Sequence, residues 1–173
     1  LPMYFLLALY VTFFAPYITD ILVDEKYKDV YIYTIFGIWV EFFRMVTNIL
    51  YTTSLSELKT KKTIAPYVVG GTVTLSLVYI FSQSSNYELY LPIGLIIGSF
   101  TTMLLMYIYM KKILDFSVRF GPLFLSFLFS LVYVFIYILD LDNSILNSFL
   151  LAGGFGIYLL FLLYFFYKKS AQL

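Results

Sequence analysis

The sequence predicts an all-α integral membrane protein, built as a bundle of six transmembrane helices. Its 173 residues are 62% hydrophobic and only 12% charged, whereas a soluble domain has about 25% charged and 45–50% apolar residues. The apolar residues form six runs of roughly the 20 residues that a helix needs to cross a bilayer. The runs show none of the alternating polarity that a transmembrane β-barrel requires. The predicted spans are 1–23, 30–51, 63–81, 89–110, 117–139 and 145–167.

The first span, residues 1–23, contains Pro16, with Asp20 one turn later. A proline inside a helix removes one backbone hydrogen bond, so we expect this helix to kink or to end early. The chain begins inside an apolar run, without an initiator methionine or a basic leader. A signal peptide would have such a leader, so we expect the chain to be a piece of a longer protein.

The second span, residues 30–51, carries two charged residues near its centre, Glu41 and Arg44. A charged side chain at the middle of a bilayer costs at least ~2.5–3.5 kcal/mol, and such residues usually face a partner or a wet cavity. Residues three apart share one face of a helix, so these two can pair. We expect the pair to line a cavity, where Arg44 would meet an anionic group and Glu41 would balance it. The alternative is a structural pair that locks this helix to a neighbour.

Two further polar residues continue the stripe, Asn48 one turn beyond Arg44 and Thr52 one turn beyond Asn48. Four polar residues on one line of a helix indicate a wet surface. They are equally compatible with hydrogen bonds between helices, which contribute only ~0.6 kcal/mol on average in membranes. The candidate substrate-binding residues are Glu41, Arg44, Asn48 and Thr52.

The later spans contain small and hydroxyl residues that predict close helix packing. Gly94 and Gly98 match the pattern of two small residues four apart that lets helices approach, and we expect packing within the bundle rather than dimerisation. The hydroxyls are expected to bond the backbone of their own helices, as such side chains often do. These hydroxyl residues are Thr72, Thr74, Ser76, Thr101 and Thr102.

The charges between the spans predict the topology. Basic residues follow the second, fourth and sixth spans, whereas acidic residues dominate after the first, third and fifth. Because basic loops stay in the cytoplasm, both ends of the chain are expected to be cytoplasmic.

The absence of histidine and cysteine removes imidazole bases, thiol nucleophiles and most transition-metal ligands. A net charge of +1 gives no sign of nucleic-acid binding.

One motif could suggest an enzyme, the alternating carboxylates of Asp140 and Asp142. Two such carboxylates can hold a divalent metal on a sugar nucleotide. We interpret them instead as an acidic loop, because the predicted topology places them outside the cytoplasm and no soluble catalytic domain accompanies them. We therefore expect no enzymatic activity, no cofactor and no bound metal.

Four stretches together resemble a known family. They are the helix end from Phe14 to Leu22, the charged segment from Glu25 to Asp29, the basic loop from Leu58 to Thr63, and the helix end from Thr74 to Tyr79. Their order is similar to the C-terminal half of polysaccharide flippases, the O-antigen and capsule transporters of the multidrug/oligosaccharidyl-lipid/polysaccharide exporter superfamily.

The resemblance implies one half of a two-bundle transporter in the bacterial inner membrane. Such a protein would move a lipid-linked oligosaccharide outward by alternating access, and its N-terminal bundle would be the missing partner. The bilayer and the anionic pyrophosphate head group of the substrate would be the other partners. The alternative is a membrane structural or assembly subunit, whose Glu41–Arg44 pair locks a partner helix.

Overall fold

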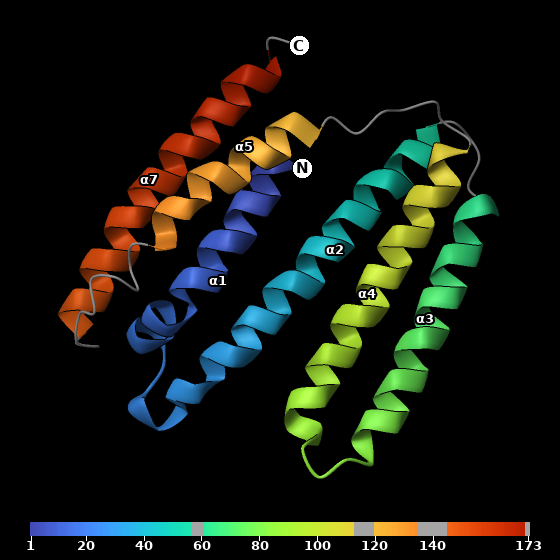
Figure 1. The fold of residues 1–173 in the computed structure, drawn as a ribbon, viewed down its shortest axis with the longest axis horizontal. Helices are drawn as coiled ribbons and strands as arrows, with labels where there is room; N and C mark the ends of the chain where they lie inside the picture. The colour runs from blue at the N-terminus through green and yellow to red at the C-terminus, as the bar shows by residue number, and fades with distance from the viewer. Residues whose placement is uncertain (57–60, 113–119, 135–144, 172–173) are drawn as a thin grey trace. The chain divides into compact units, whose positions relative to one another are not determined.

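The computed structural model describes residues 1–56, 61–112, 120–134 and 145–171, and the regular structure in this part of the chain is entirely helical (Figure 1). Helix is the expected outcome, because an isolated apolar segment must satisfy its own backbone groups. The α-helices are α1 (Pro2–Leu22), α2 (Tyr31–Ser56), α3 (Lys61–Ser82), α4 (Tyr87–Lys111), α5 (Phe120–Ser130) and α7 (Ile145–Ala171). Two 3₁₀ segments, η1 (Glu25–Val30) and η2 (Leu131–Val134), complete the described elements.

Four helices are long and apolar enough to cross a membrane, which makes this a membrane protein by length and composition. They are α1, α3, α4 and the part of α7 from Leu146 to Lys168. Helix α2 is 26 residues long, but Glu41, Arg44 and Asn48 lower its hydropathy. The prediction of six spans is therefore confirmed only in part.

The fifth predicted span, residues 117–139, is described only as α5 and η2. Its remaining residues lie outside the described part of the chain, as do Lys59, Asp140 and Asp142. Together α5 and η2 form a shorter apolar helical segment, Gly121–Val134. The acidic loop and much of the basic loop after α2 thus stay predictions from the sequence.

Helix α1 does not end early at Pro16, so that alternative of the prediction is wrong. The helix runs on to Leu22, and its end is closed by the Val23 amide, which donates to the carbonyl of Thr19 at 2.8 Å. Phe14 and Ala15, just before the proline, are fully buried. Tertiary packing around this turn stabilises the helix, and a single missing backbone hydrogen bond does not end it.

The chain divides into two compact units, described here one at a time. The first unit contains α1, η1, the start of α2 as far as Ile38, α5, η2 and α7. Helices α1 and α7 pack together along this unit, and α5 packs on α1. Its core consists of two clusters of buried residues, one of Phe14, Tyr133, Leu151 and Ala152, and one of Leu6, Leu159, Leu162 and Phe166.

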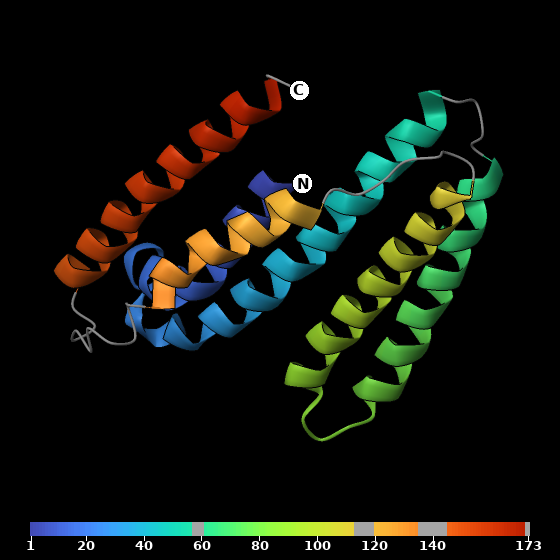
Figure 2. The ribbon, with the colours of Figure 1, turned by 45° about the horizontal axis from the view of Figure 1, so that its top comes forward.

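The second unit contains α2 from Trp39 onward together with α3 and α4. Helices α3 and α4 form an antiparallel pair joined by a short turn, and they lie side by side in both ribbon views (Figures 1 and 2). Lys61 and Lys62 begin α3, Lys111 ends α4 and Lys112 follows it as the C-cap, so all four lie at one end of the pair. Glu88 lies at the other end, as the predicted charge alternation requires.

Glycines set the close approach of α3 and α4. A Cβ atom on Gly70 would overlap the Thr102 hydroxyl, and one on Gly98 would overlap the Thr74 hydroxyl. Each threonine in turn donates to its own helix, Thr74 to Gly70 O and Thr102 to Gly98 O, both at 2.9 Å. Gly94 packs against Phe81 of α3. The prediction that Gly94 and Gly98 pack within the bundle is therefore confirmed.

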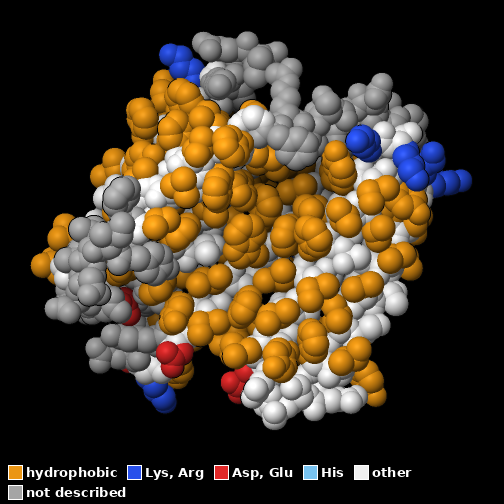
Figure 3. All heavy atoms as spheres, in the orientation of Figure 1, with side chains coloured by type: hydrophobic (Ala, Val, Ile, Leu, Met, Phe, Trp, Pro, Cys, Tyr) orange, Lys and Arg blue, Asp and Glu red, His pale blue; other side chains and the backbone are white. Residues whose placement is uncertain are grey.

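The surface of the protein is strongly apolar. On the face shown in Figure 3, hydrophobic side chains cover most of the described surface, and charged side chains lie near the ends of helices. Large apolar side chains are more than half exposed along α3 and α7, among them Leu75, Tyr79, Leu160 and Phe161. A surface of this kind suits contact with lipid rather than with water.

Candidate functional site

The second unit holds the candidate site because α2 presents two different faces there. Val46, Thr47 and Ser54 are buried and share the inner face. On the same side, the Phe43 ring meets Phe100 of α4 edge-on, with ring centroids 5.3 Å apart. Tyr51 meets Tyr67 of α3 with centroids 6.1 Å apart. These contacts fix the rotation of α2 against the α3–α4 pair.

The four predicted site residues lie along the exposed flank of α2. Arg44 and Glu41 form an ion pair with 2.6 Å between Arg44 Nη2 and Glu41 Oε2, and their side chains are 65% and 47% exposed. Asn48 and Thr52 continue the exposed stripe, and the Thr52 hydroxyl donates to the Asn48 carbonyl at 2.9 Å. The predicted pairing of Glu41 and Arg44 is confirmed, but within this unit the described chain leaves the pair open.

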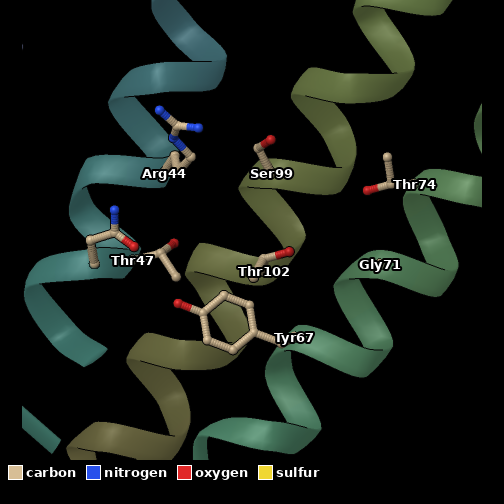
Figure 4. Close-up of a pocket in the computed structure, with 8 residues that line it drawn as sticks. Arg44, Thr47, Tyr67, Gly71, Thr74, Ser99 and Thr102 are labelled. Atoms are coloured by element: carbon tan, nitrogen blue, oxygen red, sulfur yellow. The ribbon is translucent and has the colours of Figure 1, made fainter. Parts of the chain in front are cut away.

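A pocket of about 220 Å³ opens between α2, α3 and α4 beside this stripe. Figure 4 shows Arg44 and Thr47 on α2 facing Ser99 and Thr102 on α4, with the Tyr67 ring reaching in from α3. Of the predicted residues, Arg44 and Asn48 line the pocket, whereas Glu41 and Thr52 do not. The full lining is Arg44, Thr47, Asn48, Tyr67, Gly71, Thr74, Ser99 and Thr102.

Most of the residues that line the pocket were not predicted from the sequence as site residues. Four threonines form the expected hydrogen bonds with the backbone of their own helices, namely Thr72, Thr74, Thr101 and Thr102. Thr74 and Thr102 also line the pocket, which was not expected. Thr47 lies next to Asn48 and could have been noticed as a polar neighbour. Tyr67 and Ser99 carry no such signal, because helix packing alone brings them near Arg44.

The lining is rich in groups that donate hydrogen bonds. The Arg44 guanidinium has five N–H donors in a planar fork that matches carboxylate and phosphate oxygens. The Asn48 amide and the hydroxyls of Tyr67 and Ser99 can donate or accept. Thr47 uses its hydroxyl hydrogen within α2, donating to Phe43 O at 2.9 Å, and keeps lone pairs that can accept. Such a pocket suits an anionic or polyhydroxylated group.

The described residues offer no alternative site of metal chemistry. No three acidic side chains among them lie close enough to hold a metal ion, and the chain contains no histidine or cysteine.

No protein-family model, curated protein or solved structure matches the chain. A function is therefore inferred from the pocket and its chemistry.

Proposed function

We propose that this chain is the C-terminal bundle of a membrane transporter that moves a lipid-linked oligosaccharide across the bacterial inner membrane. The observation that carries the proposal is a pocket lined by an arginine, an asparagine and five hydroxyl side chains, in a unit whose helices α3 and α4 are strongly apolar. An ionisable residue at mid-depth in a membrane is a candidate for a functional site by default. The sequence resemblance to polysaccharide flippases points to the same class.

The chemistry of the pocket suits the head group of such a substrate. Arg44 would bind the pyrophosphate or an acidic sugar through bidentate hydrogen bonds. Asn48, Ser99 and Tyr67 would bind sugar hydroxyls, each of which can donate and accept. Glu41 would hold the Arg44 side chain in place and balance its charge when no substrate is bound. In this proposal both ends of the chain are cytoplasmic, and transport proceeds by alternating access around a midplane site.

The direct test is polysaccharide export from cells that carry variants of the full-length protein. Arg44→Ala is expected to abolish export at normal protein levels, because the anionic group loses its only cation in the pocket lining. Arg44→Lys should retain part of the activity, since an ammonium keeps the charge but loses the bidentate fork. Lys62→Gln, an exposed change outside the pocket, serves as the control. Full export by Arg44→Ala would reject the proposed role.

A second candidate function deserves a test because the pair of Glu41 and Arg44 is open in the described chain. A membrane assembly subunit could cover this pair with a helix of another protein. Arg44→Ala would then leave Glu41 without its charge partner in that interface, which typically destabilises by about 3–5 kcal/mol. This alternative predicts lower protein levels or lost assembly, and the transporter proposal predicts intact protein without export.

A further inference from the structure

A second hollow lies in the first unit, between α1 and α7. It has a volume of about 450 Å³ and is lined by Met3, Tyr4 and Leu7 on α1 and by Leu163, Tyr164 and Tyr167 on α7. On each helix the three lining residues follow the same spacing of one and then three residues, so they share one face. Three apolar side chains and three tyrosines thus form a groove along the seam of two helices.

The floor of this groove rests on the core of the unit. Met3 and Leu163 pack against a cluster formed by Leu6, Leu159, Leu162 and Phe166, all of which are buried. The walls remain open, with Tyr4 41%, Leu7 40% and Tyr164 64% exposed. Because buried core residues form its floor, the groove is a feature of the packing of α1 against α7.

A basic residue, Lys168, lies near one end of the groove. Lys168 lies one helical turn beyond Tyr164 and is exposed, so the two side chains share a side of α7. No carboxylate precedes Asp20 in α1, and α7 contains none. The positive charge at this end is therefore balanced by no acidic side chain from either groove helix.

We propose that the groove binds an anionic glycerophospholipid of the leaflet at the Lys168 end. One acyl chain lies between α1 and α7, and the phosphate meets the Lys168 ammonium and the tyrosine hydroxyls at the interface. Interfacial tyrosines combine an apolar ring with a polar tip, which suits the boundary between chain and head group. This inference does not depend on the proposed transport function.

The size and charge of the groove favour a lipid over a protein helix. A helix is about 10 Å wide with its side chains, so it would fill 450 Å³ within about one turn. An acyl chain is thinner and can lie along the groove between the lining residues of the two helices. Lys168, which no acidic side chain of the two groove helices balances at this end, attracts a phosphate, since basic residues next to a membrane favour anionic lipids.

Photocrosslinking in native membranes tests the site. A benzophenone amino acid replaces Tyr164 in the full-length protein, and as a control it replaces Phe165, which is 40% exposed on another side of the same helix and does not line the groove. The lipid adducts are then identified by mass spectrometry. Anionic glycerophospholipids should be enriched at position 164 relative to position 165. Adding Lys168→Gln should reduce this enrichment roughly fivefold.

Three results would overturn the proposal. The same lipid mixture at both positions would indicate ordinary bulk lipid along α7. Adducts with a protein at position 164 would show that a helix occupies the groove. Adducts with an isoprenoid pyrophosphate would assign the site to the transported lipid. Cells that lack export can still be used for this measurement, so a failed transport proposal does not decide the outcome.

Discussion

The ion pair of Glu41 and Arg44 is the residue-level feature on which the proposed site depends. An exposed pair in water contributes only about 0–1 kcal/mol to stability, whereas a charged residue in the bilayer centre costs at least ~2.5–3.5 kcal/mol. The Arg44 side chain is 65% exposed in the described chain. Lipid tails cannot cover it at low cost, so water or polar groups must do so. The presence of such a pair was predictable from its spacing, but its exposure was not.

A second residue-level feature is the buried hydroxyl of Tyr133, which has no hydrogen-bond partner among the described residues. Its ring meets Phe14 edge-on at 5.6 Å within the aromatic core of the first unit. Tyr10, in the same cluster, donates to Ala152 O at 2.6 Å. The two tyrosines therefore share an environment but differ in hydrogen bonding.

This difference predicts opposite effects of removing the two hydroxyls. Tyr133→Phe should leave stability unchanged or raise it, because a buried polar group without a partner is unfavourable. Tyr10→Phe should destabilise by about 1 kcal/mol, since it removes the hydrogen bond to the Ala152 carbonyl. Thermal unfolding of the purified protein in detergent measures both. A larger loss for Tyr133→Phe than for Tyr10→Phe would contradict this account of the core.

At the scale of elements, the α3–α4 pair shows what a single sequence can and cannot predict. The apolar runs placed these helices within a few residues, at 63–81 and 89–110 against the observed Lys61–Ser82 and Tyr87–Lys111. The small residues marked the packing faces. Their partners were not predictable, because periodicity shows which face is buried but not which residue of another helix meets it. The reciprocal contacts of Gly70 with Thr102 and Gly98 with Thr74 appear only in three dimensions.

Close packing predicts that Gly70→Ala and Gly98→Ala destabilise the protein by about 1–3 kcal/mol each, as overpacking does. A Cβ on Gly70 would lie 2.8 Å from Thr102 Cβ and 3.1 Å from its Cα, so the helix backbones themselves must separate. Gly71→Ala is the matched control, because a Cβ there meets nothing within 4 Å. Equal stability of the Gly70 and Gly71 variants would contradict the packing.

A swap of the two contact residues gives a sharper form of the test. The double variant Gly70→Ala with Thr102→Gly moves the larger side chain to the opposite helix and removes the overlap. It should be more stable than Gly70→Ala alone, which thermal unfolding can show. Thr102→Gly alone provides the reference for the cost of a glycine inside a helix, about 1 kcal/mol. No rescue in the double variant would mean that the glycine acts through something other than this contact.

At the scale of the whole molecule, composition alone predicted the class, because low charge and long apolar runs leave few alternatives to a helical membrane protein. The pocket was harder to predict, since its lining comes from residues 44 to 102 on three helices. Only Arg44 and Asn48 carried a signal in the sequence, as polar residues in an apolar span. A hydroxyl residue in an apolar span gives the same signal in the sequence whether its side chain bonds its own helix or lines a pocket.

The charge pattern predicts how the molecule is oriented in the membrane. The turn between α3 and α4 should be outside, and the Lys111–Lys112 end of α4 should be cytoplasmic. A cysteine replacing Ser84 should therefore react with an impermeant thiol reagent in intact cells. A cysteine replacing Lys112 should react only after permeabilisation. The reverse pattern would contradict the orientation and with it the direction of the proposed transport.

In the proposed transporter the polar flank of α2 faces a water-filled cavity, and thiol labelling at Asn48 measures whether water reaches it. The chain contains no cysteine, so Asn48→Cys gives a single reactive site within it. Leu75→Cys is the control, because Leu75 is 72% exposed in the described chain but belongs to an apolar face. We expect a water-soluble reagent to label Asn48→Cys and to leave Leu75→Cys unlabelled. Protection at both positions would contradict it and favour a partner helix packed on the Glu41–Arg44 pair.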